Sequence, residues 1–107
     1  MPVIEITSKA DFMDKILGSE EPVILDCYAE WCGPCKVIAP KIEEWSNVYS
    51  KVKFYKVDVD KLDDVAQELG VRAMPTFVLF KGGQKVTEVV GARLPAIEQG
   101  IKSLLEE

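Results

Sequence analysis

Residues 23–38 read VILDCYAEWCGPCKVI, a buried-strand pattern followed by a turn with two cysteines and the start of a helix. The first six residues form a nearly continuous apolar run, which is typical of a central strand buried on both faces of a sheet. From Cys35 onward, apolar residues recur at intervals of three and four, which predicts a helix to about Asn47 or beyond. Cys32 and Cys35 are therefore expected where a strand gives way to a helix.

Outward from this stretch, the chain alternates between strand and helix patterns. Further strands are predicted at 3–6, 52–59, 76–80 and 86–90, and further helices at 8–17, 62–69 and from about 95 to 105. Gly82 and Gly83 separate the last two strands and favour a hairpin. The order βαβαβαββα predicts an α/β fold, with a central mixed five-stranded sheet flanked by four helices.

Length and composition limit the classes of function. With 107 residues, 48% of them hydrophobic, we expect a single domain over 1–107. The net charge of −5 disfavours nucleic acid and anionic membranes as partners. No apolar run approaches the ~20 residues that span a bilayer, and acidic residues interrupt the first 20 positions, unlike a signal peptide. We therefore expect a cytoplasmic protein, in which paired cysteines more often serve catalysis or metal binding than structure.

The spacing of Cys32 and Cys35 allows their thiols to form a disulfide. Unpaired N–H groups and the positive dipole end at the helix start favour a thiolate at Cys32, which is the predicted nucleophile. Cys35 begins the apolar stripe, so we expect it to be less exposed and to act as the resolving thiol. Pro34 suits the first helical turn, where its missing N–H costs nothing.

Two other uses of the pair fit the sequence less well. Tetrahedral zinc requires four ligands, and the chain offers no histidine and only Cys27 beyond the pair, so no metal site is predicted. An inert structural disulfide would close a very short loop and add little stability. Cys27 itself alternates with Leu25 in the central strand and is interpreted as a small buried hydrophobe.

Asp26 is the one carboxylate inside the central apolar run. It could lie in a solvent-facing bulge, or it could be buried with a raised pKa. We favour burial, because an acid with a pKa near neutrality could take the proton from Cys35 as that thiol attacks a mixed disulfide. Lys56, in the third strand, could pair with Asp26 from the neighbouring strand, although a lysine there is more often solvated.

The chain resembles the thioredoxin family over essentially all of its length. The motifs DCYAEWCGPCKVIAP, KVDVD, RAMPTFVLFKGG and VVGA occur in the family's order and spacing. The resemblance implies the thioredoxin fold and a disulfide reductase that serves cell redox homeostasis, with Cys32 as attacking thiolate and Cys35 as resolving thiol. It also implies that Asp26 is the buried acid and that Lys56 lies beside it.

The resemblance extends to the surface around the cysteines. It implies a cis bond between Met74 and Pro75 that faces the disulfide, where physical reasoning alone favours a plain edge-strand proline. A shallow surface for extended substrate peptides is implied at Trp31, Gly33, Pro34, Met74, Pro75, Gly91 and Ala92. The chain departs from many bacterial members at Cys27 and Tyr28, which replace Phe and Trp, and at Ala73 and Met74, which replace Gly and Ile. These departures affect the surface near the disulfide rather than its chemistry.

The implied partners are disulfide-containing proteins and a thioredoxin reductase. No GxGxxG motif follows a strand, so we expect no nicotinamide or flavin cofactor in this chain. We also expect the protein to act as a monomer. An oxidant or isomerase of the same fold is an alternative that a secretory signal would support. A binding subunit that works without turnover is another, and its function would survive mutation of both cysteines.

Overall fold

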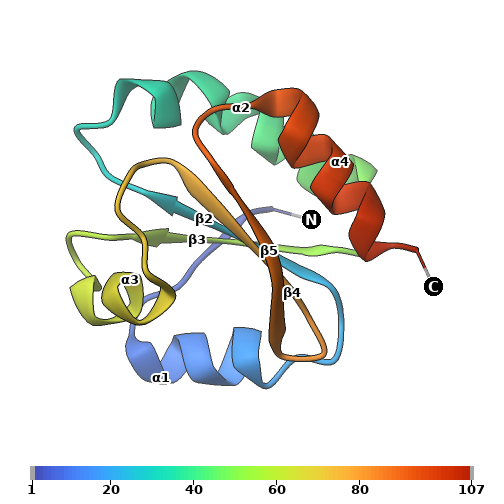
Figure 1. The fold of residues 1–107 in the computed structure, drawn as a ribbon, viewed down its shortest axis with the longest axis horizontal. Helices are drawn as coiled ribbons and strands as arrows, with labels where there is room; N and C mark the ends of the chain where they lie inside the picture. Colours follow the sequence, from blue (N-terminus) through green and yellow to red (C-terminus); the bar gives the residue numbers. More distant parts are fainter. Residues whose placement is uncertain (1, 107) are drawn as a thin grey trace.

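The computed structural model describes residues 2–106, which fold around one five-stranded sheet (Figure 1). The strands are β1 (Ile4–Glu5), β2 (Val23–Tyr28), β3 (Lys53–Asp58), β4 (Thr76–Lys81) and β5 (Gln84–Val90). Their order is β1-β3-β2-β4-β5, with the first three parallel and the last two antiparallel to their neighbours. The predicted mixed sheet is confirmed, with the central apolar run as its middle strand.

Helices cover both faces of the sheet (Figure 1). On one face lie α1 (Lys9–Phe12), its continuation η1 (Met13–Leu17) and α3 (Asp63–Leu69). On the other lie α2 (Gly33–Val48) and α4 (Leu94–Leu104). The element order is the predicted one.

The first helix differs from the sequence prediction in its second half. Ser8 caps it, because its hydroxyl accepts a hydrogen bond from the Asp11 N–H at 3.0 Å. From Met13 onward the helix is of the π type, whose turn is wider than 3.6 residues. Leu17 is 36% exposed and does not share the buried face of Phe12 and Ile16.

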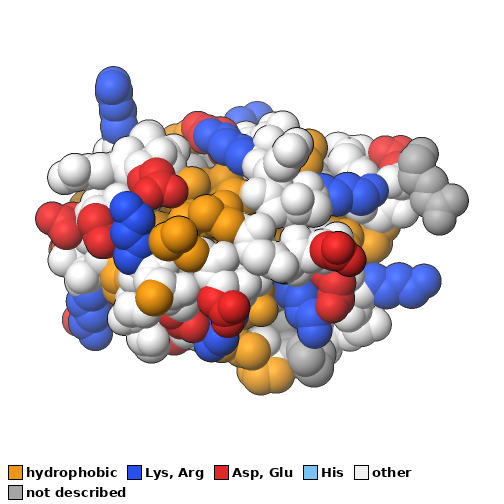
Figure 2. All heavy atoms as spheres, turned by 90° about the horizontal axis from the view of Figure 1, so that it is seen from below, with side chains coloured by type: hydrophobic (Ala, Val, Ile, Leu, Met, Phe, Trp, Pro, Cys, Tyr) orange, Lys and Arg blue, Asp and Glu red, His pale blue; other side chains and the backbone are white. Residues whose placement is uncertain are grey.

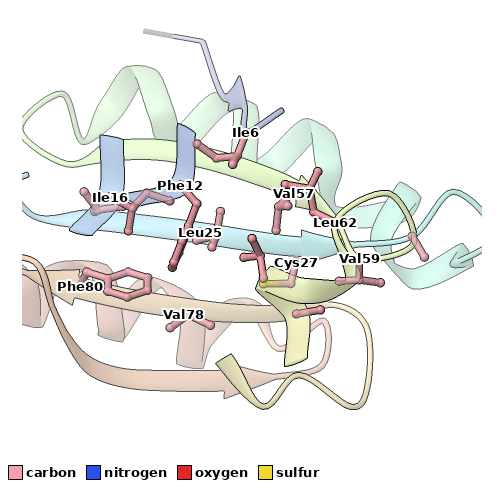
Figure 3. Close-up of a cluster of buried hydrophobic side chains, with 14 of the residues drawn as sticks. Ile6, Phe12, Ile16, Leu25, Cys27, Val57, Val59, Leu62, Val78 and Phe80 are labelled. Atoms are coloured by element: carbon pink, nitrogen blue, oxygen red, sulfur yellow. The ribbon is translucent and has the colours of Figure 1, made fainter. Parts of the chain in front are cut away.

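The sheet separates two apolar cores. Within β2, Leu25 and Cys27 point into the cluster that lies beneath α1 and α3, as Figure 3 shows. Ile24 points the other way, into the cluster beneath α2 and α4. This burial on both faces explains why β2 is apolar at almost every position rather than at alternate ones.

The β4–β5 hairpin turns through Gly82 and Gly83, whose φ angles are +62° and +78°. Both angles lie in the left-handed region that suits glycine. A Cβ at Gly82 would meet open space, whereas one at Gly83 would lie well inside van der Waals contact with the carbonyl oxygen of Leu17. Gly83 thus lets the hairpin pack directly against the end of η1.

The face that carries α1 and α3 mixes acidic and basic side chains around a patch of apolar ones (Figure 2). No extended basic area appears on this face. Within residues 2–106, no helix combines the length and the apolar character needed to cross a bilayer.

Candidate redox site

The two cysteines lie at the start of α2, directly after the turn that follows β2. Cys32 is the N-cap residue, and its sulfur accepts a hydrogen bond from the Cys35 N–H at 3.2 Å. Pro34 occupies the first helical turn, as predicted. A helix N-terminus carries a partial positive charge, so this position stabilises negative charge on the Cys32 sulfur.

Cys32 and Cys35 form a disulfide with a Cα–Cα distance of 5.3 Å. The prediction that Cys35 is the less exposed of the two is wrong for this state, since Cys32 is 3% and Cys35 6% exposed. Both residues belong to the cluster beneath α1 and α3, and each bonded sulfur covers the other. Burial therefore does not distinguish the two thiols here, whereas their positions in the helix do.

The loop before β4 completes the surroundings of the disulfide. The Met74–Pro75 peptide bond is cis, and Met74 packs against the cluster that contains both cysteines. The Pro75 carbonyl accepts a hydrogen bond from the Gly91 N–H at 2.8 Å, which joins the loop to the residue after β5. The structure thus links two of the predicted peptide-binding segments, and Ala92 follows them as an exposed residue.

Trp31, Gly33 and Pro34 are exposed beside the buried disulfide. The Trp31 side chain is 69% exposed, and its indole N–H donates a hydrogen bond to Asp60 at 2.9 Å. This bond fixes a large aromatic surface next to Cys32. Sequence reasoning did not identify Asp60, which is 29 residues away along the chain.

Asp26 is buried within β2, as predicted, and its Oδ1 has no hydrogen-bond partner among the described residues. Loss of solvation raises the pKa of its carboxyl to about 7. The positive charge of Lys56 opposes this rise, and the negative charge of Glu5 adds to it. Lys56 is the register partner of Asp26 on β3, but the two form no ion pair in the described part of the chain.

A hollow of about 350 Å³ reaches Asp26 from the side of α2. Asp26 and Cys35 both line it, so one space connects the buried acid with the second cysteine. Its other lining residues come from the end of β2, the start of α2 and β3: Tyr28, Ala29, Glu30, Lys36, Ala39 and Lys56. Such a space can transmit a proton between the two groups through water.

Cys27 points away from Asp26, into the cluster beneath α1 and α3 that also contains Cys32 and Cys35 (Figure 3), and its side chain is fully buried. Burial raises the pKa of its thiol, which keeps the thiol protonated and unreactive at neutral pH. The interpretation of Cys27 as a small hydrophobe agrees with this placement. Residues 2–106 bring together no group of three or more His, Cys, Asp or Glu side chains that could hold a metal ion.

Glu5 and Tyr28 were missed as members of the site. The Tyr28 hydroxyl donates to the Glu5 carboxylate, with both carboxylate oxygens 2.9 Å away. Glu5 is also the register partner of Lys56. The available signal was a carboxylate in the first predicted strand, but only the pairing of β1 with β3 places it near Asp26.

Comparison with known proteins agrees with this geometry. The family model described as thioredoxin matches residues 3–103. Thioredoxin Asp f 29 of Aspergillus fumigatus is 53% identical over 103 residues, which cover 94% of each chain. Thioredoxin-2 of Saccharomyces cerevisiae is 46% identical over 94% of this chain and 97% of its own. A solved Plasmodium falciparum thioredoxin superposes with a TM-score of 0.89 at 46% identity, over 94% of this chain and 98% of that one. The chain therefore belongs to the thioredoxin family and is a thiol–disulfide oxidoreductase.

Proposed function

We propose that Cys32 is the attacking thiolate and Cys35 the resolving thiol in the reduction of protein disulfides. The observation that carries this assignment is the N-cap position of Cys32, where the Cys35 N–H already donates to its sulfur. A thiolate formed at Cys32 keeps this hydrogen bond and faces the positive end of α2. Cys35 lies inside the first turn, and within residues 2–106 no N–H group donates a hydrogen bond to its sulfur.

The reaction consists of two thiol–disulfide exchanges. The Cys32 thiolate attacks one sulfur of the substrate disulfide, and the other substrate sulfur leaves as a thiolate. Cys35 then loses its proton and attacks the Cys32 sulfur, which releases the second substrate thiolate and closes the Cys32–Cys35 bond. Two electrons pass from the cysteine pair to the substrate, which takes up two protons.

Asp26 is proposed as the general base that accepts the Cys35 proton. A carboxyl with a pKa of about 7 exists in both protonation states at neutral pH, so it can accept and return a proton. Asp26 and Cys35 line the same hollow, which supports transfer between them. In this scheme, Lys56 is the partner whose charge favours the ionised form of Asp26.

The substrate peptide is proposed to lie across the surface around the disulfide. This surface consists of Trp31, Gly33, Pro34, Met74, Pro75, Gly91 and Ala92. Trp31, Gly33 and Pro34 are exposed, and Met74 packs against the cluster that contains both cysteines. Pro75 is itself buried, but its carbonyl accepts a hydrogen bond from the Gly91 N–H. Because most of these positions offer backbone or apolar contacts, the surface suits disulfide-containing proteins of varied sequence.

The cycle requires a source of electrons outside the chain, because its redox group is the cysteine pair. We propose a thioredoxin reductase as that partner, and a single-domain, monomeric protein that carries electrons in the cytoplasm. The coverage of 94% of a thioredoxin such as Asp f 29 supports a self-contained domain.

Turnover of a model protein disulfide with NADPH and a thioredoxin reductase tests the proposal. We expect NADPH oxidation that depends on both the chain and the substrate. A double variant, Cys32→Ser with Cys35→Ser, serves as the matched control and should show none. Equal turnover with this variant would contradict the cysteine mechanism.

A further inference from the structure

Glu5, Lys56 and Asp26 form a row across three neighbouring parallel strands. Glu5 on β1 and Asp26 on β2 are both register partners of Lys56 on β3, and β3 lies between β1 and β2. Register partners in a sheet point to the same face. Asp26 and Lys56 line the hollow beside α2, which identifies that face. In the sheet, Lys56 therefore stands between two carboxylate residues.

Tyr28 holds the outer carboxylate in this row. Its hydroxyl oxygen lies 2.9 Å from both carboxylate oxygens of Glu5, so one proton is shared between two acceptors. Burial and the Glu5 hydrogen bond raise the pKa of Tyr28, which keeps this donor protonated. The Lys56 ammonium lies 5.9 Å from the centre of the Tyr28 ring. Tyr28 thus links Glu5 and Lys56 from a position two residues beyond Asp26.

The charged surroundings of Asp26 come from several elements. Lys56 attracts its carboxylate and Glu5 repels it from two strand spacings away, roughly 10 Å. On the β4 side, its register partner is the apolar Phe77. The remaining charged or titratable groups next to Asp26 or in the hollow are Cys27, Tyr28, Glu30, Cys35 and Lys36. Asp58, a buried carboxylate two residues beyond Lys56 on β3, accepts hydrogen bonds from the Asp60 and Lys61 N–H groups instead. Glu5 is the partly buried anion whose charge acts on Asp26 from the far side of Lys56.

We propose that Glu5 is a positioning residue for the redox reaction, because it shares Lys56 with Asp26 and limits how strongly the lysine favours the carboxylate form of Asp26. This inference rests on the proposed function of Asp26 as the base for Cys35. Without the Glu5 charge, Lys56 would turn wholly towards Asp26 and favour its ionised form. Asp26 would then give its proton up at a lower pH and would be a weaker base.

Glu5→Gln tests this role, because the amide keeps an acceptor for the Tyr28 hydroxyl and loses the charge. The Asp26 carboxyl is followed by ¹³C NMR as pH is varied, in the oxidised protein. We expect its titration midpoint to fall by about 0.5 pH unit. Resolution of a preformed mixed disulfide by Cys35 should then be about two- to threefold faster at pH 6, with little change or a slight loss above pH 8.

Two further single variants separate the effect of the Glu5 charge on Asp26 from the effect of a change in net charge. Glu20→Gln changes the net charge equally but lies in the exposed loop before β2, so it should leave both readouts unchanged. Glu5→Asp retains the charge and should keep the midpoint near the parent value. A Glu5→Gln midpoint equal to that of Glu20→Gln would overturn the proposal.

The Lys56→Gln background tests whether the effect passes through the lysine. Sharing of Lys56 predicts that Glu5→Gln shifts the Asp26 midpoint less in this background than in the parent. An equal shift of the Asp26 midpoint in both backgrounds would mean that Glu5 repels the Asp26 carboxylate directly. It would overturn the proposal that the two carboxylates share Lys56. If the midpoint moves but the resolution profile does not, the role of Asp26 as the base is wrong, and Glu5 loses its part in the reaction although its coupling to Asp26 stands.

Discussion

At the scale of single residues, position in the helix separates the two cysteines more clearly than exposure does. Both are almost fully buried in the disulfide form. Only Cys32 is the N-cap, with an N–H group directed at its sulfur. The difference in their proposed chemistry therefore originates in a backbone hydrogen bond and the helix dipole.

The first prediction concerns the serine variants of the pair. Cys35→Ser leaves the attacking thiol without its resolving partner, so we expect it to accumulate a stable mixed disulfide with an oxidised substrate. Cys32→Ser should form little adduct, because the remaining thiol has no N-cap stabilisation. Mass spectrometry after incubation with substrate distinguishes the two. Predominant adducts through Cys35 would reverse the assigned roles.

The sequence was sufficient to place Asp26 in a buried strand, because a lone carboxylate interrupts an apolar run. It was not sufficient to find Glu5. Glu5 lies 23 residues from Tyr28, its hydrogen-bond donor, and no local pattern joins the two. Such a contact depends on the order of the strands, which periodicity alone does not determine.

At the scale of elements, periodicity predicted every strand and helix, and the errors lie at edges and in local geometry. β1 has only two residues where four were expected, and β3 runs from Lys53 to Asp58 rather than from 52 to 59. The π-type turn η1 escaped prediction, because a 3.6-residue period assumes uniform α-helix. Gly83 shows a related limit, since its hairpin role was visible in the sequence but its contact with η1 was not.

The second prediction compares alanine at the two hairpin glycines. Gly82→Ala should lower the free energy of unfolding by about 1–2 kcal/mol, because alanine is unfavourable at positive φ. Gly83→Ala carries a similar backbone cost and also forces a Cβ against the Leu17 carbonyl, which should add about 1–3 kcal/mol. Denaturant unfolding of the two variants measures the difference. Equal losses in the free energy of unfolding would show that η1 moves away from the added Cβ without a further energetic cost.

At the scale of the whole molecule, the sheet separates two apolar cores, and Asp26 is an ionisable group buried in its middle strand. The other buried positions of β2 are apolar and favour folding. Asp26 acts in the opposite direction whenever it is ionised, because its carboxylate loses solvation and its Oδ1 gains no hydrogen bond from residues 2–106. The proposed site therefore reduces global stability in a way that depends on pH.

The third prediction gives the sign of this effect. The folded pKa of about 7 lies above the ordinary value of 3.8, so the unfolded chain releases the proton first. The penalty is absent below pH 3.8, grows as pH rises to about 7 and is full above that value. At ~1.4 kcal/mol per pH unit, it reaches about 4 kcal/mol at most.

Asp26→Ala should accordingly be more stable than the parent by about 2–4 kcal/mol above pH 8, and the advantage should vanish near pH 4. Denaturant unfolding across this pH range measures it. Asp26→Asn is the control of similar shape and should follow the same trend with pH. A variant that is less stable than the parent at every pH would identify Asp26 as a structural partner rather than a buried acid.

The two tryptophans occupy opposite environments, which gives the protein two natural fluorophores. Trp31 is 69% exposed and adjoins the disulfide, while Trp45 is 5% exposed and lies in the core beneath α2 and α4. Indole emission shifts with the polarity of its surroundings, and a neighbouring disulfide quenches it. The intensity of Trp31 should therefore follow oxidation and reduction, whereas the wavelength of Trp45 should follow unfolding. Both optical signals are available without any added label.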